Sequence, residues 1–127
     1  MTVPDIRLTP LATGGGGMPF LLGPSLGTRV ARVWDEARPY LAERHPLFGW
    51  DLPGHGVSPA ATEPFTVDEV AEGVLRAADD VGLGRFAVAG ISLGGLVSLA
   101  IALNAPDRIV SATMICSLPR LGTAEGW

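Results

Sequence analysis

The stretch RFAVAGISLGG, residues 85–95, decides how this sequence folds. Its first six residues predict a buried strand, and the apolar run Leu93–Asn104 predicts a helix that ends before Pro106. The motif G-x-S-x-G at residues 90–94 therefore lies where a strand turns into a helix. A turn of this kind lifts the hydroxyl of Ser92 out of the sheet, where a base and oxyanion-stabilising donors can reach it. We interpret Ser92 as a nucleophile; the alternative is a glycine-rich turn whose serine caps the helix.

Alternating strands and helices are expected on both sides of this stretch. Strands are predicted at residues 3–8, 20–23, 46–50, 85–90 and 109–116, and helices at residues 29–42, 67–81 and 93–104. Pro39 is expected to kink the first helix or to end it early. Thr66 and Glu69 form a capping box at the start of the second, whose acidic residues, Glu69 among them, are assigned to its solvent face. Helices between short apolar runs imply βαβ crossovers, and hence an α/β fold with a doubly wound, mostly parallel sheet.

The composition excludes several classes of protein. The chain has 127 residues, of which 47% are apolar and 17% charged, so it is long enough for one domain and too hydrophobic for a disordered one. Its nine basic residues are all arginine, whereas a P-loop needs a lysine. The net charge of −4, without a basic cluster, argues against a nucleic-acid partner.

Neither a metal nor an organic cofactor is expected from the residues present. One cysteine and two histidines cannot form a zinc site without carboxylates, and a single cysteine cannot form a disulfide within the chain. Residues 82–87 match G-x-G-x-x-A, but they follow a predicted helix and precede a predicted strand. Because a dinucleotide-binding motif needs the reverse order, we interpret these residues as a turn.

The uncharged run of residues 86–106 is long enough to be a candidate membrane span. It contains three glycines, however, and a buried parallel strand that leads into a buried helix gives the same uncharged pattern. The first ten residues lack the charged and apolar regions of a signal peptide. We therefore expect a cytoplasmic protein without a membrane partner, whose oligomeric state the sequence leaves open.

Three segments resemble the N-terminal half of an α/β-hydrolase, in that family's order and spacing. GPSLGT (residues 23–28) is similar to the loop after the family's third strand, DLPGHGVS (residues 51–58) to the turn after its fourth, and the third segment is the turn at Ser92. Within this superfamily, the S-L-G-T form of the first segment resembles the 3-oxoadipate enol-lactonases. So do NAPDR (residues 104–108) and LGTAEGW (residues 121–127).

The resemblance implies a site and a reaction. Ser92 would be the nucleophile, and the backbone N–H groups of Leu26 and Leu93 would form the oxyanion hole. The substrate would be a small lactone or ester: 3-oxoadipate enol-lactone, opened to 3-oxoadipate in the catabolism of aromatic compounds, through an acyl-serine and without a cofactor. The alternatives are a general carboxylesterase or a cofactor-free perhydrolase of the same fold, or a non-catalytic module. Residues 1–127 would be the N-terminal portion of a single domain, with the tail from about residue 118 entering a cap region.

The two histidines are not interpreted as the general base. In the resembled family the order along the chain is serine, then acid, then histidine, and no histidine follows Ser92 here. We therefore expect a fragment that lacks the base and its orienting acid and is itself inactive. His55 is assigned a structural role in its glycine-rich turn, His45 a place in a loop, and Asp51 the role of accepting N–H bonds within its own turn.

Overall fold

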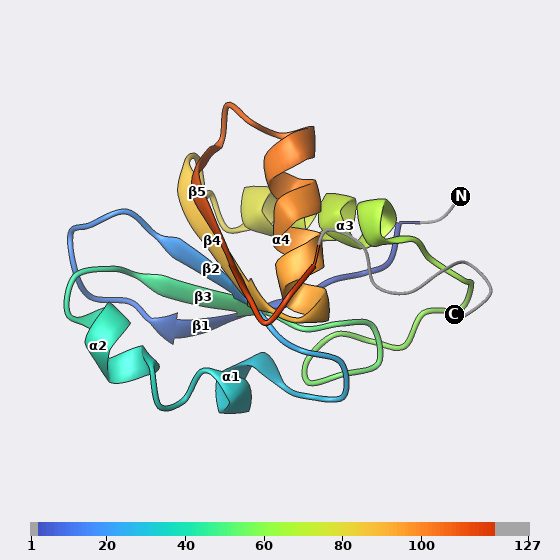
Figure 1. Cartoon of the computed structure of the whole chain (residues 1–127), viewed down its shortest axis with the longest axis horizontal. Helices are drawn as coiled ribbons and strands as arrows, with labels where there is room; N and C mark the ends of the chain where they lie inside the picture. Colours follow the sequence, from blue (N-terminus) through green and yellow to red (C-terminus); the bar gives the residue numbers. More distant parts are fainter. Residues whose placement is uncertain (1–2, 119–127) are drawn as a thin grey trace.

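Residues 3–118, which the computed structural model describes, form a five-stranded sheet with helices on both faces (Figure 1). The strands are β1 (Leu8–Ala12), β2 (Phe20–Gly23), β3 (Leu47–Trp50), β4 (Phe86–Ile91) and β5 (Ile109–Ile115). They lie in the order β1-β3-β2-β4-β5, with β1 antiparallel to β3 and all other neighbours parallel. The predicted α/β fold with a mostly parallel, doubly wound sheet is confirmed.

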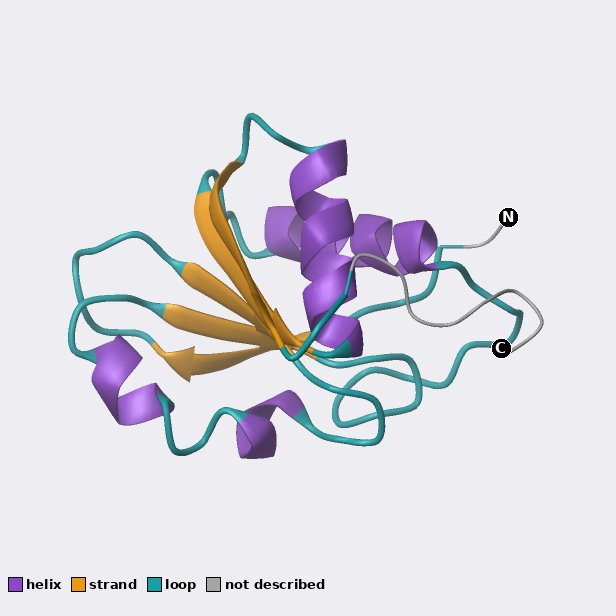
Figure 2. Ribbon diagram, viewed as in Figure 1, coloured by secondary structure: helices purple, strands orange, loops and turns teal. Residues whose placement is uncertain are grey.

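Two pairs of helices cover the two faces of the sheet (Figure 2). On one side lie α1 (Val30–Val33) and α2 (Arg38–Ala42), and on the other lie α3 (Val67–Asp80) and α4 (Leu93–Asn104). Neighbouring residues of a strand point to opposite faces, so Leu21 packs into the cluster beneath α3 and α4, whereas Leu22 packs into the cluster beneath α1. The strands in the middle of the sheet are buried on both faces, which explains their uncharged sequences.

The uncharged run of residues 86–106 is divided between β4 and α4, as its glycines indicate. Within residues 3–118, no helix combines the length and the apolar character that crossing a membrane requires. The cap region expected from about residue 118 lies outside the described residues, apart from Leu118 itself.

The first strand begins later than expected. Residues 3–8 were predicted to form it, but β1 starts at Leu8, and residues 3–7 instead run beside α3. Gly73 of α3 makes room for them, because a Cβ there would lie 2.8 Å from Ile6 Cγ1 and from the Pro4 carbonyl oxygen. The side chain of Ile6 is therefore buried in the core without being part of the sheet. Pro10 is tolerated in β1 because this strand is an edge.

One helix was predicted over residues 29–42, and this prediction was wrong because the helix is interrupted. The segment forms α1 and α2 with a turn between them, and Pro39 lies in the first turn of α2. Proline has no N–H for a helical hydrogen bond and is accommodated at the start of a helix.

The start of α3 shows both bonds of the predicted capping box. The Glu69 N–H donates to Thr66 Oγ1 at 3.1 Å, and the Thr66 N–H donates to Glu69 Oε1 at 3.0 Å. This second bond turns the Glu69 carboxylate back over the helix end, where its residue is only 6% exposed. The assignment of Glu69 to the solvent face was therefore wrong, because a carboxylate that caps the start of the helix cannot also extend into solvent.

Candidate active site

Ser92 occupies a sharp turn between β4 and α4, with φ of 54° and ψ of −114°. Such a conformation is uncommon for a residue other than glycine, and strain of this kind is concentrated at functional sites. The surrounding backbone holds it in place: the Ser92 N–H donates to the Ile115 carbonyl at 2.8 Å. The Ser92 carbonyl in turn accepts hydrogen bonds from Ser117 Oγ at 2.7 Å and from the Gly95 N–H at 3.0 Å.

The two outer glycines of the G-x-S-x-G motif are required by space. A Cβ on Gly90 would overlap the Gly94 carbonyl, because β4 and α4 meet here at close range. A Cβ on Gly94 would overlap the Pro24 carbonyl oxygen. The start of α4 therefore lies directly against the loop that follows β2, and the motif brings these two segments together.

The loop after β2 contains a tight turn over Ser25–Thr28. The Thr28 N–H donates to the Ser25 carbonyl at 3.2 Å, and Gly27 has φ of +80°, which are the features of a type II turn. Leu26 is the second residue of this turn, and its side chain is 66% exposed. At the beginning of the loop, Trp34 Nε1 donates to the buried Gly23 carbonyl at 2.8 Å.

The two backbone amides expected to form an oxyanion hole have no acceptor within residues 3–118. This holds for the Leu26 N–H in the turn and for the Leu93 N–H in the first turn of α4, where helical amides are free in general. Both residues line the same cavity, which has a volume of about 450 Å³. Free, fixed donors beside a cavity are what stabilisation of a developing oxyanion requires.

The cavity is lined mainly by apolar side chains. Its walls come from Leu26, from the turn at residues 52–55, from Phe65 and the first residues of α3, and from Leu93 and Val97 of α4. None of the lining residues is an aspartate, a glutamate, a lysine or an arginine. A concave apolar site with a few directed polar groups is typical of small-molecule binding.

Both ring nitrogens of His55 are already hydrogen-bonded. Its Nε2 accepts from the Gly27 N–H at 3.1 Å, which requires the ring proton to be on Nδ1, where it donates to the Pro53 carbonyl at 3.0 Å. Among residues 3–118, no hydrogen bond joins Ser92 Oγ to a histidine. His45 pairs with the Met18 carbonyl instead, ahead of β3. The structural assignment of His55 agrees with these contacts.

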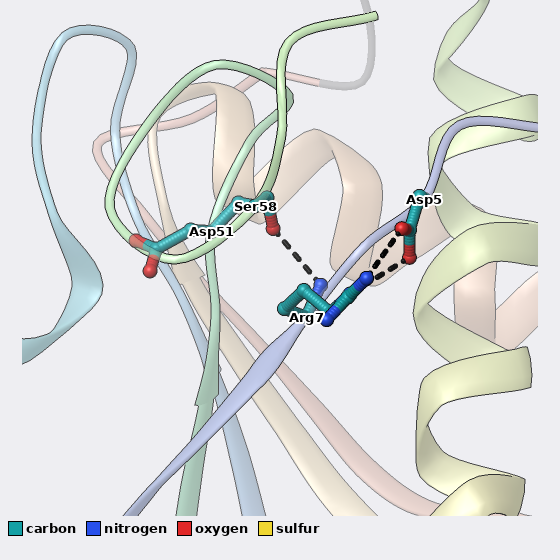
Figure 3. Close-up of polar contacts among 4 residues, drawn as sticks. All are labelled: Asp5, Arg7, Asp51 and Ser58. Carbon is teal, nitrogen blue, oxygen red and sulfur yellow. Dashed lines mark hydrogen bonds and ion pairs between the residues drawn. The ribbon is translucent and has the colours of Figure 1, made fainter.

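Asp51 fixes the turn over residues 51–58, and Figure 3 shows this residue together with Ser58 and the bond from the Arg7 N–H to Ser58 Oγ. Its buried carboxylate accepts from the Val57 N–H at 3.1 Å, as expected, and also from the Val30 N–H at the start of α1 at 2.8 Å. Ser58 Oγ donates to the Asp51 carbonyl at 2.8 Å and accepts from the Arg7 N–H at 2.9 Å. Asp51 and Ser58 therefore connect this turn by hydrogen bonds to the start of α1 and to the segment before β1.

The Arg7 side chain forms an exposed ion pair with Asp5 at 2.8 Å. The hydrogen bonds from Arg7 lower the pKa of the Asp5 carboxyl. Neither residue lines the 450 Å³ cavity. Within residues 3–118, no group of three or more histidine, cysteine, aspartate or glutamate side chains gathers as a metal site would need.

Replacement of Asp51 by asparagine is expected to lower the free energy of unfolding by about 2 kcal/mol, because one buried backbone N–H would face an amide NH₂ instead of an oxygen. Chemical denaturation measures this loss. The matched control is Asp35→Asn, since Asp35 is exposed and its carboxylate has no hydrogen-bonded partner within residues 3–118. Equal stabilities for the two variants would contradict the role assigned to Asp51.

Sequence reasoning missed three contacts that shape this site. They are the bond from Gly27 to His55, the bond from Trp34 to Gly23, and the bond from Ser117 to Ser92. Each joins segments that come together only in the folded chain. The sequence carries no local signal for them, beyond the presence of polar groups near the motifs.

Comparison with known proteins identifies the family to which this fold and its motifs correspond. The family profile described as alpha/beta hydrolase fold matches residues 12–127. The 3-oxoadipate enol-lactonase 2 of Acinetobacter baylyi is 26% identical over 128 residues, covering 100% of this chain and 48% of that protein. The dihydrolipoyllysine-residue acetyltransferase component of the acetoin cleaving system of Pseudomonas putida is 38% identical over 104 residues, covering 82% of this chain and 28% of that protein.

A solved structure extends the comparison to three dimensions. The enol-lactonase from Burkholderia xenovorans superposes with a TM-score of 0.83 at 28% identity, covering 96% of this chain and 47% of that one. The chain thus spans less than half the length of these relatives. The profile match includes β2, the turn at Asp51 and the strand–serine–helix turn. The chain belongs to the α/β-hydrolase fold family.

Proposed function

We propose that the protein is a serine hydrolase that opens a small enol-lactone, with Ser92 as the nucleophile. The observation that carries this proposal is the positive φ of Ser92 at the junction of β4 and α4, where the N–H of the next residue, Leu93, has no acceptor within residues 3–118. A serine that only capped the helix would accept a hydrogen bond from the first turn, whereas the Ser92 side chain makes no cap bond to α4. The geometry therefore favours catalysis over capping.

In the proposed reaction, Ser92 Oγ attacks the lactone carbonyl carbon and the carbonyl oxygen becomes an oxyanion. The N–H groups of Leu26 and Leu93 hold that oxyanion. Collapse of the tetrahedral intermediate breaks the ring C–O bond, and the enol oxygen leaves. Water then hydrolyses the acyl-serine, which releases the opened acid and restores the serine.

The proton of Ser92 needs an acceptor, and we propose that a later histidine, oriented by an acid, supplies it. His55 is unsuited to this role because its two ring nitrogens are engaged with Gly27 and Pro53. In the α/β-hydrolase order of residues, the acid and the histidine follow the nucleophile. Because this chain spans less than half the length of the enol-lactonases it resembles, the activity is proposed for a protein that also contains the remaining length of those relatives.

The similarity to the enol-lactonases of Acinetobacter baylyi and Burkholderia xenovorans favours an enol-lactone as the substrate. We expect kcat/KM for 3-oxoadipate enol-lactone to exceed that for p-nitrophenyl acetate by about 100-fold, because the fit of a substrate in an apolar pocket is worth about 10- to 200-fold in selectivity. Steady-state kinetics on the complete protein measure both values. A preference for the neutral aryl ester would instead identify a general carboxylesterase.

A further inference from the structure

The imidazole of His55 bridges two loops that are far apart in the sequence. Its Nδ1–H donates to the Pro53 carbonyl within its own turn, and its Nε2 accepts from the Gly27 N–H across 28 positions of the chain. Gly27 directly follows Leu26, so the bonded N–H belongs to the peptide group that begins with the Leu26 carbonyl. The Leu26 N–H belongs to the preceding peptide group, which is joined to this one at the Leu26 Cα, so the position of Gly27 sets that of the Leu26 amide through one pair of backbone torsions.

The two loops differ in how firmly they are held. The turn at residues 51–58 is anchored by the buried Asp51 carboxylate and by Ser58. In the turn at residues 25–28, the other hydrogen bonds found among residues 3–118 join Ser25 to Thr28, and so stay inside the turn. The exposed Leu26 side chain adds little packing. Among residues 3–118, the bond from Gly27 to His55 is therefore the hydrogen bond that joins this turn to the rest of the site, in addition to the packing of the preceding Pro24 against α4.

We propose that His55 is a positioning residue, which orients the Leu26 N–H for oxyanion stabilisation by holding Gly27 from the anchored turn. This inference rests on the proposed function, because it assigns His55 a part in the same site. His55 takes no proton from Ser92. It acts through the Leu26 amide, so its loss reduces stabilisation of the transition state more than binding of the substrate.

Two variants with the same amide chemistry test this role. In His55→Gln the side-chain oxygen reaches about as far as Nε2 and can accept from Gly27, whereas in His55→Asn the amide ends near the position of Nδ1 and cannot. We expect His55→Asn to lower kcat about tenfold and to leave KM within about twofold of wild type. This loss is smaller than the one expected when an oxyanion donor is removed, because the Leu26 N–H is still present but less well oriented. His55→Gln is expected to recover most of that loss. Equal kcat values for the two variants would overturn the proposal.

A spectroscopic measurement keeps the test independent of activity and of the variants' folding. In ¹⁵N-labelled wild-type protein, a coupling across the hydrogen bond between the Gly27 nitrogen and His55 Nε2 is expected, together with ring shifts of the Nδ1–H form. Absence of both would overturn the proposal. If Ser92→Ala abolishes turnover while His55→Asn keeps the wild-type kcat, the positioning role is wrong and the hydrolase assignment stands. If Ser92→Ala retains turnover, the proposed function itself is wrong.

Discussion

Replacement of Ser92 by alanine is expected to lower kcat by several orders of magnitude, on the order of 10⁴-fold or more, as loss of a catalytic nucleophile does. In the proposed mechanism, Ser92 Oγ is the atom that forms the acyl-enzyme, and alanine has no atom that could replace it. The fold is expected to persist, since the Ser92 side chain makes no cap bond and alanine is no bulkier at the same φ. Steady-state kinetics and thermal melting of the complete protein measure the two effects.

Ser98 provides a matched control on the same helix. Its hydroxyl donates to the Gly94 carbonyl at 2.8 Å and is buried within α4. Ser98→Ala therefore removes a hydroxyl of the same kind, and kcat is expected to stay within a few-fold of wild type. Turnover near the wild-type rate in purified Ser92→Ala would remove Ser92 from the mechanism.

Replacement of Leu26 by proline is expected to lower kcat by about 10²- to 10³-fold, the usual cost of one oxyanion-hole donor. Proline is favoured at the second position of a type II turn, so the backbone of residues 25–28 is expected to be kept. The substitution then removes the N–H alone among the polar groups of the turn. Kinetics on the complete protein give kcat and KM separately, and the loss is expected in kcat.

The companion variant Leu26→Ala keeps the N–H and removes the side chain from the cavity wall. Its kcat is expected to remain within a few-fold of wild type, with any change appearing in KM. Similar kcat values for the proline and alanine variants would show that the Leu26 amide has no part in the reaction.

Elements with local signals were predicted closely from the sequence. The helix Leu93–Asn104 has the bounds expected from Ser92 and Pro106, and the capping box at Thr66 forms as predicted. These signals act through the backbone within a few residues, so the rest of the chain need not be known. In the G-x-S-x-G motif, Gly90 belongs to the same class, because it is required by the close approach of β4 and α4, whereas Gly94 makes room for the distant Pro24.

Elements that depend on distant partners were predicted less well. Whether residues 3–8 or 8–12 form β1 is decided by pairing with β3 and by the space that Gly73 leaves for Ile6, neither of which is local. The contact between His55 and Gly27 is of the same kind. A histidine in a glycine-rich turn gives no indication of which amide its free nitrogen will meet after folding.

Covalent trapping tests the central claim, that Ser92 becomes acylated, most directly. The complete protein is treated with a small fluorophosphonate that reacts with activated serines, and its intact mass is measured before the adduct is located by peptide mapping. The account predicts one adduct, on Ser92, in the wild-type protein and none in Ser92→Ala. An adduct on another residue, or an equal extent of modification in Ser92→Ala, would contradict it.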